Sequence, residues 1–184
     1  CTPLHSAVMN GHKSVVQVLL AAGVDKEARA PSRAAPLHIA AVEGHEAMMQ
    51  VLLAAGADMT EARDIEQSTP LHLAANQGYE AVVQLLLAAG ADKDARALAQ
   101  VAPLHLAAGR DHEAVVQVLV AAGADKEARA AFQIAPLHIA AGDGHEVMVQ
   151  MLLAAGADKE AGTKPQGTPL HSAAMQGHEA VMQV

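Results

Sequence analysis

The sequence predicts an all-α fold in which pairs of short helices, separated by hairpin-like fingers, repeat along the chain and stack. The tripeptide Pro-Leu-His begins at residues 3, 36, 70, 103, 136 and 169, which is a period of 33 or 34 residues. A fixed period of this length indicates a repeat protein. The chain has no Trp, one Tyr and one Phe. Its core therefore has to be built from aliphatic side chains, which suit closely packed helices.

The third copy shows how each element is predicted. Thr69 is a favourable N-cap, and Pro70 fits the first position of a helix. Gly78 ends that helix, because glycine adopts the left-handed conformation common at helix C-termini. A second helix over residues 79–89 carries apolar residues at i, i+3 and i+4 spacing. Its apolar stripe is wide, so we expect it to be buried between neighbouring copies.

Six copies within one domain of residues 1–184 are predicted. They span about residues 2–34, 35–68, 69–101, 102–134, 135–167 and 168–184, the last being incomplete. No single copy can bury its own apolar surface, so the copies have to stack. The chain stops within a predicted helix, and we expect it to be a fragment of a longer array.

The segment APLHIAAGDGHE, residues 135–146, places two histidines and two carboxylates within nine residues. Such groups can bind a metal ion or transfer protons. Both histidines, however, recur once per copy. His138 corresponds to His5, His38, His72, His105 and His171, and His145 corresponds to His12, His45, His112 and His178. Packed helices lie roughly 8–10 Å apart, so such a ladder cannot converge on one ion whose ligands lie about 2 Å away.

The histidines are therefore predicted to be structural, and we expect no catalytic residue, no metal site and no cofactor. Buried neutral histidines should have lowered pKa values. The folded protein should then lose stability as the pH falls below roughly 6.

The composition limits the partners. The formal net charge is −8, which disfavours nucleic acid, because nucleic-acid binding depends on Lys and Arg. No apolar run is long enough to insert into a membrane. Cys1 is the single cysteine, so no intrachain disulfide can form. We expect an intracellular, cytoplasmic protein that is monomeric as a domain.

Four motifs recur in phase: PLHxAA, Gly-His between the helices, VVQxLLxAGAD, and Thr-Pro at residues 2, 69 and 168. On these motifs the whole chain resembles the ankyrin-repeat family. The resemblance implies antiparallel helix pairs with projecting hairpin fingers, arranged as a curved α-solenoid. It also implies that the concave face and the fingertips bind proteins, and that the PLH histidine tethers neighbouring loops by hydrogen bonds.

The fingers depart from the family pattern, which has Asp-x-x-Gly before Thr-Pro. The glycine column reads Arg33, Gln67, Gln100, Gln133 and Gln166, and the aspartate column reads Ala30, Asp64, Ala97, Ala130 and Thr163. Because a type I turn prefers Asp first and Gly last, these fingers should be looser or differently shaped. Asp111 replaces the glycine between two helices, and we expect a left-handed backbone there.

Threonine before the PLH proline has become alanine at residues 35, 102 and 135. The loss of an N-cap hydroxyl typically costs ~1 kcal/mol. The substitution Ala102→Thr is therefore predicted to stabilise the chain.

Columns that vary between copies predict the surface that contacts a partner. One column lies at the end of the first helix and the other at the fingertip. The predicted partner-binding residues are Met9, Asn10, Val42, Glu43, Asn76, Gln77, Arg110, Asp143 and Met175 at the helix ends, and Ile65, Leu98 and Phe132 at the fingertips. Phe132 is the strongest single anchor, being the only Phe. The alternatives are that the apolar fingertips pack against each other or vary without constraint.

The predicted function is a non-catalytic scaffold that binds a protein partner of unknown identity. The alternative is a spacer or regulatory segment of a larger enzyme or channel whose active part lies outside this chain. An enzymatic role of the chain itself is a third hypothesis, but no histidine stands out from its repeat-periodic equivalents as a nucleophile, base or ligand.

Overall fold

The computed structural model describes residues 1–59, 62–164 and 167–184. The chain divides into two compact units, Cys1–Asp92 and Lys93–Val184, and each is described by itself. The described residues of both units form helices and contain no β-strand, which confirms the predicted all-α fold.

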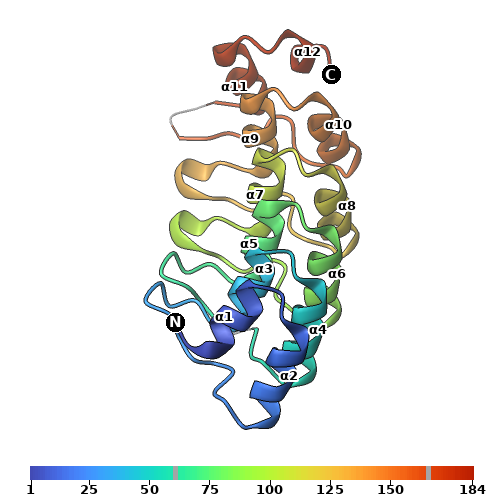
Figure 1. Cartoon of the computed structure of the whole chain (residues 1–184). Helices are drawn as coiled ribbons and strands as arrows, with labels where there is room; N and C mark the ends of the chain where they lie inside the picture. The colour runs from blue at the N-terminus through green and yellow to red at the C-terminus, as the bar shows by residue number, and fades with distance from the viewer. Residues whose placement is uncertain (60–61, 165–166) are drawn as a thin grey trace. The chain divides into compact units, whose positions relative to one another are not determined.

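The first unit consists of three helix pairs in two layers (Figure 1). Its helices are α1 (Pro3–Met9), α2 (Lys13–Ala21), α3 (Pro36–Val42), α4 (Glu46–Ala54), α5 (Pro70–Gln77) and α6 (Glu80–Ala88). The first helices of the pairs form one layer, with α1 against α3 and α3 against α5. The second helices form the other layer, with α2 against α4 and α4 against α6.

The second unit repeats this arrangement. Its helices are α7 (Pro103–Gly109), α8 (Glu113–Ala121), α9 (Pro136–Asp143), α10 (Glu146–Ala154), α11 (Pro169–Gln176) and α12 (Glu179–Met182). The helix α9 packs between α7 and α11, and α10 packs between α8 and α12. Two short 3₁₀ turns, η1 (Leu98–Gln100) and η2 (Ala131–Gln133), lie at the tips of its fingers.

The helix boundaries follow from the residues at their ends. In the third copy, Thr69 is extended and Pro70 opens α5, and Gly78 ends it with φ of 79°. The second helix begins at Glu80, one residue later than predicted, because Tyr79 occupies the N-cap. Asp111 has φ of 59°, so the left-handed backbone predicted at this position is confirmed.

The core is a ladder of leucines and alanines. Each inner copy contributes one fully buried leucine from each helix: Leu37 and Leu52, Leu71 and Leu86, Leu104 and Leu119, and Leu137 and Leu152. Buried alanines such as Ala74 and Ala75 allow the first helices to approach closely. Burying one leucine contributes roughly 1.5–3 kcal/mol, so this ladder contributes strongly to stability. In the part of the chain described here, no helix is both long and apolar enough to span a bilayer.

Candidate functional site

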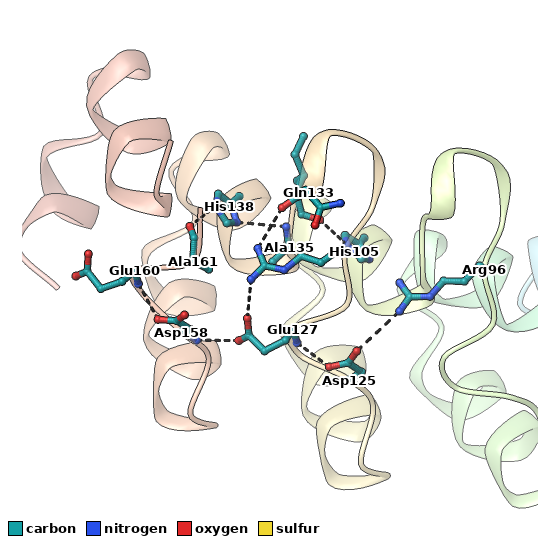
Figure 2. Close-up of polar contacts among 12 residues, drawn as sticks. Arg96, His105, Asp125, Glu127, Gln133, Ala135, His138, Asp158, Glu160 and Ala161 are labelled. Atoms are coloured by element: carbon teal, nitrogen blue, oxygen red, sulfur yellow. Dashed lines mark hydrogen bonds and ion pairs between the residues drawn. The ribbon is translucent and has the colours of Figure 1, made fainter. Parts of the chain in front are cut away.

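Four of the PLH histidines, His5, His38, His105 and His138, form hydrogen bonds with both ring nitrogens. Nδ1 of His105 accepts a hydrogen bond from the backbone N–H of Ala102 at 3.2 Å. Nε2 lies 3.1 Å from the carbonyl oxygen of Ile134, in the next finger (Figure 2). A backbone N–H can only donate, so Nδ1 carries no proton and Nε2–H is the donor. The ring thus links its own helix start to the following copy.

The same tether recurs in both units. The Nε2 atoms bond to carbonyl oxygens as follows: His5 to Ala34 at 3.2 Å, His38 to Ser68 at 3.2 Å and His138 to Ala161 at 2.9 Å. The predicted role of these histidines in tethering neighbouring loops is therefore confirmed. With both nitrogens engaged, they offer no lone pair to a metal, and the described residues contain no cluster of three His, Cys, Asp or Glu side chains that could hold one.

Burial sets the ionisation of these imidazoles. It lowers the pKa values of His38, His105 and His138 below the ordinary 6.5, and their hydrogen bonds to backbone carbonyls oppose the shift only in part. The neutral form that the tether requires is thus the form that the buried site favours.

The second histidine column joins copies in the opposite direction. Nε2 of His45 bonds to the carbonyl of Met9 at 3.1 Å, and Nε2 of His178 bonds to the carbonyl of Gly142 at 2.9 Å. These carbonyls lie at the ends of first helices, where they have no intrahelical partner. A Cβ at Gly144 would lie 2.5 Å from the His178 ring. The Gly-His motif therefore combines a left-handed residue with space for the next copy's ring.

The threonines before the PLH prolines were predicted to cap the first helices, but their hydroxyls mainly contact histidines. The hydroxyl oxygens of Thr2 and Thr69 lie 2.8 Å from Nδ1 of His5 and His72, rather than capping a backbone N–H. Only Thr168 also accepts a backbone bond, a long one of 3.4 Å from His171. Because Nδ1 is the acceptor, the hydroxyl reinforces the histidine tether.

The fingers are differently shaped, as expected from their missing glycines. Arg33, Gln67, Gln100 and Gln133 all have left-handed backbones, and Gln166 lies outside the described residues. In the second unit, Ala99 and Phe132 are left-handed as well, so each of these fingertips has two consecutive residues in this conformation. L-residues pay a steric cost there, and a bulky one such as Phe is rare.

An arginine in the finger stem bonds to the backbone carbonyl of the residue that replaces the family's glycine. The distances from Nη1 are 3.1 Å for Arg29 to Arg33, 2.9 Å for Arg63 to Gln67, 3.3 Å for Arg96 to Gln100 and 3.1 Å for Arg129 to Gln133. This bond holds the finger closed where no glycine is present (Figure 2).

The predicted fingertip residues are exposed. The exposed fractions of Ile65, Leu98 and Phe132 are 62%, 60% and 73%, so neighbouring fingers do not cover them. Adjacent fingers instead meet through their backbones, with Ile65 N–H donating to Ser32 and Lys164 N–H donating to Phe132, both at 2.9 Å.

Each unit has a groove between a finger and the ends of first helices. The groove of the second unit, about 540 Å³, brings together the predicted residues Phe132, Asp143 and Met175. The groove of the first unit, about 250 Å³, brings together Met9, Val42 and Glu43. The other predicted residues, Asn10, Ile65, Asn76, Gln77, Leu98 and Arg110, do not line these two grooves.

Comparison with known families decides what this architecture is. The family described as ankyrin repeats matches residues 4–97, 59–130 and 104–184. The chain belongs to the ankyrin-repeat family. Ankyrin repeats are generally protein–protein interaction modules and are typically non-catalytic. No curated protein matches the chain.

The ankyrin fold also shows a set of carboxylates that sequence reasoning missed. Glu27 accepts a hydrogen bond from the N–H of Asp58 at 2.8 Å, Asp94 from Asp125 at 2.7 Å, and Glu127 from Asp158 at 2.8 Å. Each bond joins one copy to the next, as Figure 2 shows for Glu127. The sequence signal for these bonds was an acidic residue at the same position of these copies. Acidic residues that alternate with basic ones had suggested a solvated face instead.

Proposed function

We propose that this chain is a non-catalytic protein-interaction scaffold that contacts a protein partner through the ends of its first helices and its fingertips. The observation that carries the proposal is the groove of the second unit, where Phe132, Asp143 and Met175 meet. Phe132 is left-handed and 73% exposed. A strained, exposed aromatic side chain contributes nothing evident to folding, and such positions cluster at binding sites.

The surrounding framework supports the same function. Histidines, carboxylates and arginines of the repeat hold the fingers and helix ends rigidly, and rigid binding surfaces lose less entropy on association. We propose that all six copies form one ankyrin-repeat domain that acts as a monomer. The net charge of −8 disfavours a nucleic-acid partner. The single cysteine, Cys1, supports an intracellular, cytoplasmic location.

The test is a pull-down with three baits and quantitative mass spectrometry. One bait is the chain as it stands, and the second carries Leu98→Asp, Arg110→Glu and Phe132→Asp. The third is a matched control with Val18→Asp, Lys13→Glu and Val147→Asp. It lowers the net charge by the same amount as the second bait and likewise replaces two exposed apolar side chains, here on helices α2 and α10. Circular dichroism establishes that all three are folded.

We expect one or more proteins that the first and third baits retain and the second loses. Equal retention by all three baits would contradict the proposed surface. Enrichment of nothing would favour the alternative of a spacer or regulatory segment.

A further inference from the structure

The two grooves occupy the same place in the repeat, but their linings differ. Counted from the proline of each PLH motif, Ser32 corresponds to Phe132, Val42 to Gly142 and Leu73 to Ser172. All six of these residues line their respective grooves. The two grooves can therefore be compared position by position within the same chain.

At two of these three positions the second unit has the smaller residue, and at the third Phe132 replaces Ser32. Gly142 and Ser172 lie side by side in the groove, since a Cβ at residue 142 would lie 3.6 Å from Cβ of Ser172. The corresponding Val42 and Leu73 carry bulk at these positions. The volume is about 540 Å³ with the small pair and about 250 Å³ with the large pair. The larger groove of the second unit thus coincides with smaller side chains on two of its helices.

The walls of the larger groove are apolar and partly exposed. Phe132, Ile134 and Ile139 line it, as does Met175, whose exposed fraction is 85%. Aromatic and methionine side chains around a concave site are typical of pockets that bind a large apolar group. A partner side chain that enters here would cover Phe132 and Met175.

The charged groups define the polar part of the site. The carboxylate of Asp143 lines the groove at the end of α9 and forms no ion pair with any described residue. Lys164 lies on the finger side of the groove. The second unit carries 7 Lys and Arg against 10 Asp and Glu, and the whole chain is at −8. The free carboxylate and the net charge both favour a cationic group next to the helix end.

We propose that the groove of the second unit binds an extended segment of a partner protein that presents a large apolar side chain and a neighbouring Lys or Arg. The apolar side chain packs over Gly142 and Ser172 against Phe132 and Met175. The basic side chain pairs with Asp143, and Lys164 sets the direction of the segment by repelling its basic residue from the finger side. The proposal rests on the proposed function and adds the chemistry of the partner.

The experiment selects random dodecapeptides displayed on phage against the whole chain, and then measures the affinity of synthetic copies of the enriched peptides by fluorescence anisotropy. One variant fills the groove with Gly142→Val and Ser172→Leu, the residues that the same columns hold in the first unit. A second variant carries Ser172→Leu alone, and a third carries Asp143→Asn. The control is Glu113→Gln, which removes one charge from α8, outside the groove.

We expect enriched peptides to pair a large apolar residue with Lys or Arg within two positions. Filling the groove should weaken their binding at least about tenfold. Asp143→Asn should weaken it about threefold to tenfold and reduce its salt dependence, and Glu113→Gln should leave it within about twofold.

The absence of enriched peptides, a consensus without a basic residue, or unchanged binding by the filled variant would each overturn the inference. These outcomes differ from failure of the proposed function. If the pull-down partner is lost with the fingertip variant but kept by the filled variant, the interaction surface stands and only the side-chain pocket is wrong.

Discussion

Nε2 of His105 lies 3.1 Å from the carbonyl oxygen of Ile134, although the two residues are 29 positions apart in the chain. The imidazole is 1% exposed. Its removal leaves the buried N–H of Ala102 without its partner and takes away one of the two hydrogen bonds to the Ile134 carbonyl, which keeps the bond from the N–H of Ala130 at 2.8 Å.

His105→Ala should therefore lower the free energy of unfolding by about 2–3 kcal/mol, from the unpaired N–H of Ala102, the lost bond to Ile134 and the cavity together. The measurement is urea denaturation followed by circular dichroism. The matched control is His12→Ala, at an exposed histidine, which should change stability by no more than about 0.5 kcal/mol. Equal effects of the two substitutions would refute the tether as a stabilising contact.

Stability should decrease as the pH falls from about 6.5. His38, His105 and His138 have pKa values below 6.5 in the folded chain. The unfolded chain therefore takes up protons first, and the stability present above pH 6.5 is lost as the pH approaches the folded pKa values. Melting temperatures between pH 7.5 and pH 5.5 check this, and a flat profile would contradict it. His105→Gln should show a shallower decline than the unmodified chain.

Gln133→Gly should stabilise the fourth finger. Gln133 has φ of 64°, a conformation that costs an L-residue roughly 1–2 kcal/mol, while glycine pays only its extra chain entropy of roughly 0.5–1 kcal/mol. A net gain of about 0.5–1 kcal/mol follows. In α8, Gln117→Gly should instead cost about 1 kcal/mol. A loss at both positions would show that the finger is not strained.

Ala102→Thr should raise stability by about 0.5–1 kcal/mol, because the added hydroxyl can donate to Nδ1 of His105, as Thr69 does to His72. Thr69 is buried in the same column, so the position accommodates the side chain. The isosteric Ala102→Val supplies the bulk without the hydroxyl. The melting temperature of Ala102→Thr should be higher than that of Ala102→Val, and the reverse order would contradict the prediction.

Glu127→Ala should destabilise the second unit by about 1–2 kcal/mol, because it removes the acceptor for the N–H of Asp158 and a contact of 3.3 Å with Arg129. Glu127→Gln keeps an acceptor oxygen and should lose less. Glu160, in the same column, accepts no bond from another copy in the described residues, so Glu160→Ala should be nearly silent. The measurement is the free energy of unfolding of the three variants by chemical denaturation. Equal values for Glu127→Ala and Glu160→Ala would show that Glu127 is only a solvated charge.

Local patterns predicted the helices well. Pro70 and Gly78 mark the start and the end of α5, since proline at N1 and a left-handed C-terminal glycine act within one turn of the chain. The exposure of Ile65, Leu98 and Phe132 was also expected from their place at fingertips. The Thr–His bond and the carboxylate tethers were missed, because their partners are chosen by packing and not by spacing alone.

The sequence by itself determined the period, the helix pairs, the aliphatic core and the structural role of the histidines, because each depends on local residue chemistry repeated in phase. Only the tertiary structure decided which variable residues share a groove. Phe132, Asp143 and Met175 come from a finger and two different helices. Their meeting point, and the space beside Gly142 and Ser172, depend on how neighbouring copies pack. The position of a residue within its own repeat does not reveal this.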